Sequence, residues 1–148
     1  MGEIKLNPLT HRFITNKIYY QLKEEYDINF LSQKSLIWGS IRPDFIRESI
    51  PHFKFRGEKP FYNKCKNIIT SSQLSIKKFS RELGQIFHYI CDYFCHAHNQ
   101  KELVDKKRLH IINEINLQRF IQKVKSDFFN IKYNDHSSFT FKEIMETN

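Results

Sequence analysis

Apolar residues recur at intervals of three and four along most of this chain, which is the spacing of one face of an α-helix. In residues 11–26 the pattern runs through Phe13, Ile14, Ile18 and Leu22, with Thr10 placed to cap the first turn. The same periodicity predicts further helices over residues 29–38, 61–74, 76–97, 101–129 and 138–146. The sequence contains no internal repeat. Its apolar periodicity predicts a succession of helices.

Glycine and proline set the expected helix ends. We expect Gly39 to end the second helix and Pro43 to bend the chain, since proline disfavours a helical conformation in the residue before it. Asp44 would then cap a short helix of its own, and residues 51–60 would form a loop. Because the chain holds only four glycines and four prolines, long helices are favoured over a sandwich or barrel. The predicted fold is all-α, a single-domain helical bundle over residues 1–148.

The helix expected at residues 76–97 is the most apolar, as a buried central helix would be. Its predicted inner face consists of Phe79, Leu83, Ile86, Phe87, Ile90, Phe94 and Ala97. His88 and Asp92 form a polar stripe on this helix, and a buried polar stripe needs partners. Gly84, one turn before His88, either permits close approach of another helix or is a tolerated helix glycine.

Two histidine–carboxylate pairs carry the candidate chemistry. His88 and Asp92 are four residues apart, as are His110 and Glu114, so each pair projects from one helix face. A single pair of this kind is usually a surface ion pair. Two pairs on neighbouring helices, with more histidines between them, leave a metal site and ordinary ion pairs as equal alternatives, and imidazole with carboxylate would suit zinc.

Composition narrows the range of partners and compartments. The formal net charge of +8 favours phosphate-bearing partners, either nucleic acid or anionic lipid headgroups. No apolar run reaches the roughly 18–20 residues of a transmembrane helix, and the first residues contain no apolar segment typical of a signal peptide. We therefore expect a cytoplasmic protein with reduced cysteines. Cys91 and Cys95 flank Asp92 and are either soft metal ligands or, the favoured interpretation, small buried groups.

The polar residues also form an ordered series along the chain. It contains an early histidine, an aspartate followed by a histidine, the first pair, a histidine six residues after that pair and the second pair: His11, Asp44, His52, His88, Asp92, His98, His110 and Glu114. This series resembles the zinc-dependent phospholipase C family of bacterial enzymes, whose fold is shared by the S1/P1 nucleases.

The resemblance implies an all-helical fold around two to three zinc ions. One zinc would be held by Asp44, His52, His88 and Asp92. A second would be held by His98, His110 and Glu114. A third would use His11, Asp92 or Glu114, and the amino-terminal residue. By this pattern His98 is the ligand, although His96 continues the helical stripe from Asp92.

The implied activity is that of a zinc-dependent phosphodiesterase. It would hydrolyse a phospholipid to diacylglycerol and a phosphorylated headgroup with metal-activated water, and Asp44 would act as general base. Peripheral contact with a membrane surface is expected. One alternative is a single-strand nuclease of the S1/P1 type, which the basic charge and aromatic content suit, although those enzymes usually carry aspartate where Glu114 stands. The other is a catalytically inactive, zinc-containing helical binding protein.

Overall fold

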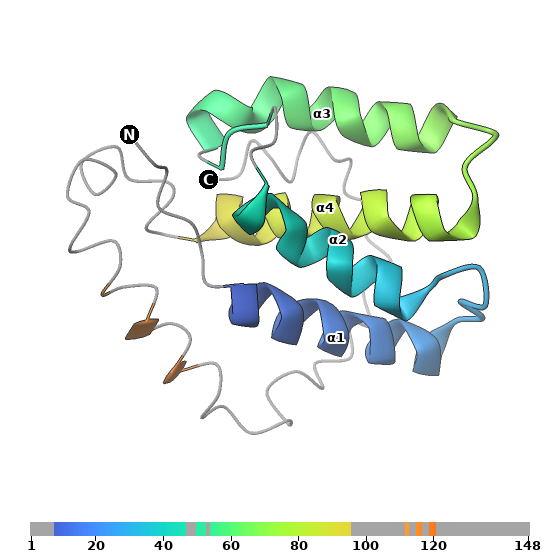
Figure 1. Ribbon diagram of the computed structural model, residues 1–148, viewed down its shortest axis with the longest axis horizontal. Coiled ribbons are helices and arrows are strands. Elements are labelled where there is room, and N and C mark those ends of the chain that lie inside the picture. Colours follow the sequence, from blue (N-terminus) through green and yellow to red (C-terminus); the bar gives the residue numbers. More distant parts are fainter. Residues whose placement is uncertain are drawn as a thin grey trace.

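The computed structural model describes residues 8–46, 50–52 and 54–95, together with positions 112, 115, 116, 119 and 120. Within the continuous stretches the chain forms four helices and no strand, which confirms the all-α prediction (Figure 1). The helices are α1 (Pro8–Glu25), α2 (Gln33–Phe45), α3 (Lys54–Thr70) and α4 (Ile76–Phe94). Among these described helices, none combines the length and the apolar character that crossing a bilayer requires.

The four helices meet in a way that gathers several helix ends at one place. α2 packs against both α1 and α4, and α3 packs against α4. Figure 1 shows the beginning of α1 and the ends of α2 and α4 at the same end of the bundle. Residues 50–52 lead into α3 from that end as well. Side chains from the first turn of one helix and the last turns of two others can therefore face one another.

α2 does not follow the predicted boundaries. Ser32 caps its first turn, and the helix continues through Gly39 and Pro43 to Phe45, so Asp44 lies in the last turn and caps no new helix. The predicted bend is absent: α2 continues through Pro43, whose missing N–H removes one backbone hydrogen bond, while the residue itself is buried in the bundle. Gly39 keeps a negative φ, so it is not the left-handed residue that a helix ending would use.

The predicted loop over residues 51–60 is also wrong in most of its length. α3 begins at Lys54, includes Pro60 and ends at Thr70, four residues earlier than predicted. Pro60 costs this helix one backbone hydrogen bond, but the following Phe61 is fully buried. Burial of an aromatic ring in the core contributes enough stability to offset that loss.

α2 and α4 cross at a pair of glycines. A Cβ atom added to Gly39 would lie 2.0 Å from the carbonyl oxygen of Arg81, and one added to Gly84 would lie 2.0 Å from that of Leu36. Ser40 and Ser80, both buried, are the neighbouring small residues. Only glycine permits the two backbones to come this close, so the interpretation of Gly84 as a site of close helix approach is confirmed.

The predicted burial of the His88–Asp92 stripe on α4 is confirmed, whereas the predicted apolar inner face is less buried than expected. His88 and Asp92 have no exposed surface, whereas the predicted inner face is half-buried and Phe94 is 53% exposed. The apolar core instead joins α3 and α4 with the segment before α3, through Ile50, Phe61, Cys65, Tyr89 and Tyr93. Hydrophobic periodicity alone did not show which face of α4 is buried most deeply, because three other elements cover the histidine side.

The helix predicted over residues 101–129 is described at five positions, all of them helical. Two of these residues, Ile112 and Phe120, are 49% and 60% exposed. The remainder of that helix and the helix predicted over residues 138–146 lie outside the described residues.

Candidate metal centre

α4 supplies two of the site residues, His88 and Asp92, in the spacing that the sequence predicts. His88 Nε2 lies 3.2 Å from Asp92 Oδ2. The other ring nitrogen, Nδ1, lies 2.8 Å from the carbonyl oxygen of Ser40 on α2. Because a carbonyl only accepts hydrogen bonds, we place the proton on Nδ1. Nε2 is then left with a lone pair directed into the site, which is the form of histidine that binds a metal.

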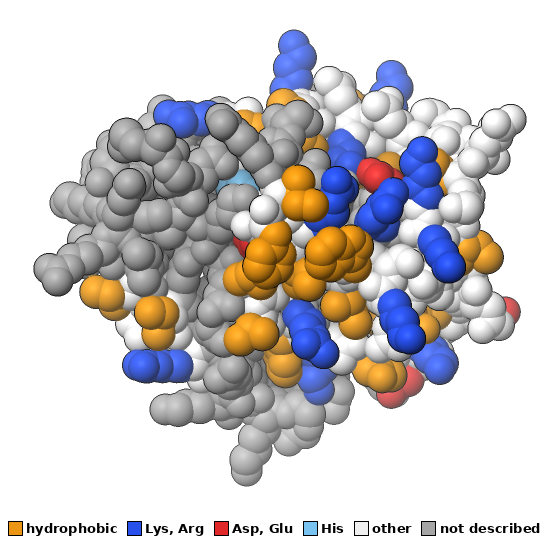
Figure 2. Space-filling view, in the orientation of Figure 1, with side chains coloured by type: hydrophobic (Ala, Val, Ile, Leu, Met, Phe, Trp, Pro, Cys, Tyr) orange, Lys and Arg blue, Asp and Glu red, His pale blue; other side chains and the backbone are white. Residues whose placement is uncertain are grey.

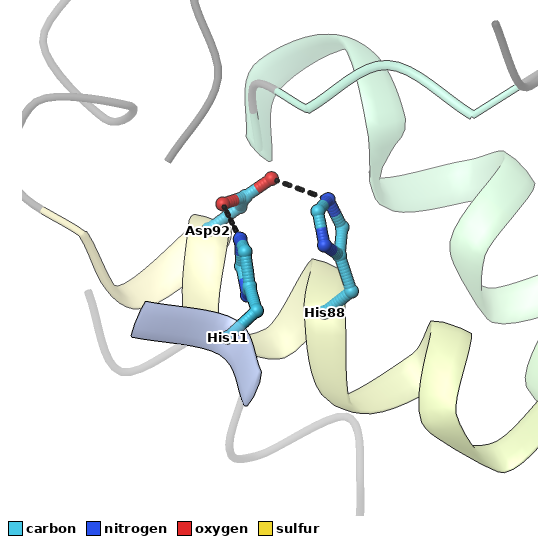
Figure 3. A group of neighbouring side chains, drawn as sticks. All are labelled: His11, His88 and Asp92. Atoms are coloured by element: carbon cyan, nitrogen blue, oxygen red, sulfur yellow. Dashed lines mark ion pairs between the residues drawn. The ribbon is translucent and has the colours of Figure 1, made fainter. Parts of the chain in front are cut away.

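His11, in the first turn of α1, completes one side of this pair. Its ring is fully buried and stacks on His88, with 3.9 Å between ring centroids. Its Nε2 lies 3.3 Å from Asp92 Oδ1. Figure 3 shows the carboxylate of Asp92 directed toward both imidazoles, one oxygen to each. Neither ring nitrogen of His11 forms a well-oriented hydrogen bond with the described residues.

His52 and Asp44 enter from the other elements. His52, just before α3, places Nδ1 2.5 Å from Asp92 Oδ2 and 3.0 Å from His88 Nε2. Asp44, in the last turn of α2, has a side chain only 3% exposed. Its Oδ2 lies 3.9 Å from His11 Nε2 and 4.0 Å from His88 Nδ1. Five residues that the sequence singles out are thus brought together from four parts of the chain.

These side chains form two overlapping groups of metal-ligand type. His11, His88 and Asp92 make one, and Asp44, His52 and His88 make the other. Within each group the ligand atoms all lie within 4.8 Å of one another. Three imidazoles and two carboxylates buried at such distances, with no well-oriented hydrogen bond at His11, are a donor set that fits zinc.

The electrostatics of Asp92 favour an ionised ligand. Complete burial acts to raise the pKa of its carboxyl group, but the electrostatic interaction with His88 and the contacts from His11 and His52 hold that pKa well below its usual range. Metal binding requires a deprotonated carboxylate. Asp92 is therefore poised to ligate without a proton having to leave first.

Tyr93 fixes the segment that carries His52, a role that sequence reasoning missed. Its hydroxyl donates a hydrogen bond to the carbonyl oxygen of Pro51 at 3.1 Å. Burial, with the nearby charge of Asp92, raises the pKa of Tyr93, so the hydroxyl keeps its proton. α3 passes so close that a Cβ on Gly57 would lie 2.0 Å from this hydroxyl oxygen. In the sequence, Tyr93 is marked only by its position directly after Asp92. That position does not distinguish it from the other aromatic residues as the one that holds the His52 segment.

The cysteines stand apart from the two ligand groups. Burial raises the pKa of Cys65 to about 11 and, with the neighbouring Asp92 charge, that of Cys91 to about 12. Both are therefore neutral thiols near pH 7, and the three cysteines form no disulfide. Neither ligand group includes Cys91 or Cys95. By exposed surface Cys91 and Cys95 are each only partly buried, so their interpretation as small buried groups is confirmed in part.

The other predicted ligands lie outside the described residues: His98, His110 and Glu114, together with His96 and the amino-terminal residue. The ligand set of the second zinc and the choice between His96 and His98 therefore stay predictions.

Comparison with known proteins decides the family. The family model described as zinc-dependent phospholipase C matches residues 10–147, nearly the whole chain. The chain belongs to the zinc-dependent phospholipase C family. The matched range includes every predicted ligand side chain, and it confirms the resemblance inferred from their order. Neither the curated proteins nor the solved structures yielded a significant match to this phospholipase C family member.

Proposed function

We propose that this family member is a zinc-dependent phosphodiesterase that hydrolyses a phospholipid to diacylglycerol and a phosphorylated headgroup. The observation that carries the proposal is the convergence of three histidines and two aspartates, all buried or nearly so, in a chain of this family. A helical bundle gains no stability from burying such groups alone, since their desolvation is costly. A bound cation removes that cost.

Asp92 would contribute one carboxylate oxygen to each of two zinc sites. Asp44, His52 and His88, with Asp92 Oδ2, would hold one ion. His11 and Asp92 Oδ1 would contribute to another. His98, His110 and Glu114 are the predicted ligands of a further ion. When bound, zinc polarises phosphoryl oxygens and lowers the pKa of a coordinated water.

The protein's own groups position the site and receive the proton. The carbonyl of Ser40 holds the ring of His88 in one tautomer, and the hydroxyl of Tyr93 holds the backbone next to His52. The Asp44 carboxylate lies beside His11 and His88, with little of its surface in contact with solvent. As water attacks phosphorus, Asp44 would take the proton of that water as general base.

Metal content and hydrolysis, measured on one preparation, test this function. Purified protein should contain two to three zinc ions per chain and should release phosphorylcholine from phosphatidylcholine and from a soluble choline phosphodiester. Single-stranded DNA should not be cleaved at a comparable rate. His52→Ala should lose zinc and turnover, whereas the matched substitution His96→Ala should keep both.

The other outcomes select between the alternatives. Cleavage of single-stranded DNA in preference to the choline esters would favour a nuclease of the S1/P1 type. Full zinc content without turnover on either substrate would favour the zinc-containing binding protein. Absence of zinc from protein purified and refolded with zinc supplied would overturn the metal centre itself.

A further inference from the structure

The outer face of α2 consists of Lys34, Trp38, Ile41, Arg42 and Phe45, which recur at helical spacing. The opposite face is buried against the bundle, with Leu36 and Ser40 fully inaccessible. On the outer face Trp38 is 45% exposed and Phe45 is 65% exposed. Two large aromatic rings are therefore exposed at positions of α2 where packing against the bundle does not require an apolar side chain.

Within α2, the charged side chains on this face are basic. Lys34 and Arg42 lie on it, and the only acidic residue of α2 is Asp44, whose side chain is 3% exposed and faces the histidines. Figure 2, viewed with α2 in front, shows hydrophobic side chains gathered there with lysine and arginine side chains around them. Aromatic rings with basic neighbours are the composition of surfaces that enter an anionic bilayer interface. Lysine is depleted in the cores of protein–protein interfaces.

The outer face of α2 also reaches the metal centre. Phe45 follows Asp44 directly in the chain, and Ile46, the next residue, is 42% exposed. At the same end of the bundle, Leu9 of α1 is 56% exposed and stands two residues before His11. A surface seated on these residues would lie beside the ligands contributed by α1 and α2.

We propose that the outer face of α2 docks this protein on an anionic phospholipid bilayer, with Trp38 and Phe45 inserted in the interface. The inference rests on the proposed function, because the phospholipid headgroups would then be presented at the end of the bundle that holds the metal centre. Lys34 and Arg42 supply attraction to the anionic headgroups. The aromatic rings supply burial of apolar surface.

Trp38 is the only tryptophan of the chain, so its fluorescence reports on this face alone. Zinc-supplied full-length protein is titrated with vesicles of phosphatidylcholine containing phosphatidylserine, and with vesicles of phosphatidylcholine only. Insertion should shift the Trp38 emission to shorter wavelength on the anionic vesicles. Binding is measured independently by co-sedimentation, so loss of docking and loss of hydrolysis are separate results.

Two pairs of variants locate the surface. Phe45→Ser should raise the lipid concentration for half-binding about tenfold, whereas Ile69→Ser, at an 83% exposed position of α3, should leave it unchanged. Lys34→Glu should weaken binding roughly tenfold or more, because it replaces attraction with repulsion. Lys66→Glu, exposed on α3, makes the same change in net charge and should weaken binding much less. Circular dichroism confirms that each variant is folded.

Three results would overturn the proposal. The first is Trp38 emission that does not change at any lipid concentration. The second is equal weakening by Lys34→Glu and Lys66→Glu, which would show diffuse charge attraction without a defined surface. The third is an emission shift that follows protein concentration in the absence of lipid, which would show that a second copy of the chain covers this face.

Discussion

The two sides of the candidate metal centre are built in different ways. α4 contributes His88 and Asp92 from one face of a single helix, four residues apart. The opposing side contributes His11, Asp44 and His52, each from a different element and each close to a helix end. The pair on α4 depends on local helix geometry. The other three residues depend on how α1, α2 and the segment before α3 pack against α4.

This difference explains which parts of the site are tightly supported. The α4 pair needs only that α4 be helical, and Ser75 caps its first turn. The opposing residues need tertiary contacts: the glycine crossing for α2 and the Tyr93 hydrogen bond for His52. Substitutions on the opposing side should therefore affect zinc and chemistry by displacing elements as well as by removing ligands.

The largest effect is expected at Asp44, on the opposing side. Asp44→Asn should lower turnover of a soluble choline phosphodiester by about 10²–10⁴-fold, the range for a general base, while keeping a near-native circular dichroism spectrum and most of its zinc. The control is Asp27→Asn, since Asp27 is exposed and its carboxylate accepts a hydrogen bond from the backbone N–H of Asn29. An Asp44→Asn variant as fast as the wild type would show that another group activates the water.

Removal of zinc should affect the two sides of the site to different extents. Chelation should lower the melting temperature by about 10 °C, because the buried ligands are left facing one another without a cation. Hydrogen exchange should then rise first at residues 50–52 and in the first turn of α1, and later around His88 on α4. Identical melting of chelated and zinc-supplied protein would contradict a structural role for zinc.

Gly84→Ala, although it lies on α4, should disturb the packing of α2, which carries Asp44 on the opposing side. Alanine favours a helix, yet its Cβ would meet the backbone of Leu36, so we expect a net loss of about 1–3 kcal/mol in the free energy of unfolding. Zinc affinity should fall too, because displacement of α2 moves the Ser40 carbonyl away from His88. Lys77→Ala, at an exposed position of α4, should cause neither change. Denaturant unfolding and chelator competition measure the two quantities, and an unaffected Gly84→Ala variant would refute the role of the crossing.

The smallest effect is expected for Tyr93→Phe, which removes one hydrogen bond to the His52 segment. Zinc affinity should fall about tenfold, as for other groups that orient metal ligands. Melting of the zinc-free protein should change little, since the net contribution of one hydrogen bond is about 1 kcal/mol. Tyr62→Phe, on an exposed position of α3, is the control. A Tyr93→Phe variant that loses stability without zinc but keeps the wild-type zinc affinity would show that Tyr93 serves packing alone.

The sequence by itself determined the helical character of the chain and the types of residue in the site. The 3.6-residue period identified α1 and α4, and the four-residue spacing placed His88 beside Asp92, because both are local properties of a helix. The order of the ligand residues was sufficient to identify the family. Of the ligands implied by that order, the described part of the chain brings together five.

Only the tertiary structure decided which helix faces are buried and where α2 and α3 run. Local sequence rules predict a helix end at Gly39 and a bend at Pro43, yet α2 continues through both, because close packing in the bundle uses the glycine and buries the proline. The predicted apolar face of α4 is half-buried, while its histidine face lies at the centre of the bundle. Burial depends on the elements that cover a face, and contacts between distant segments are not encoded in the periodicity of any one of them.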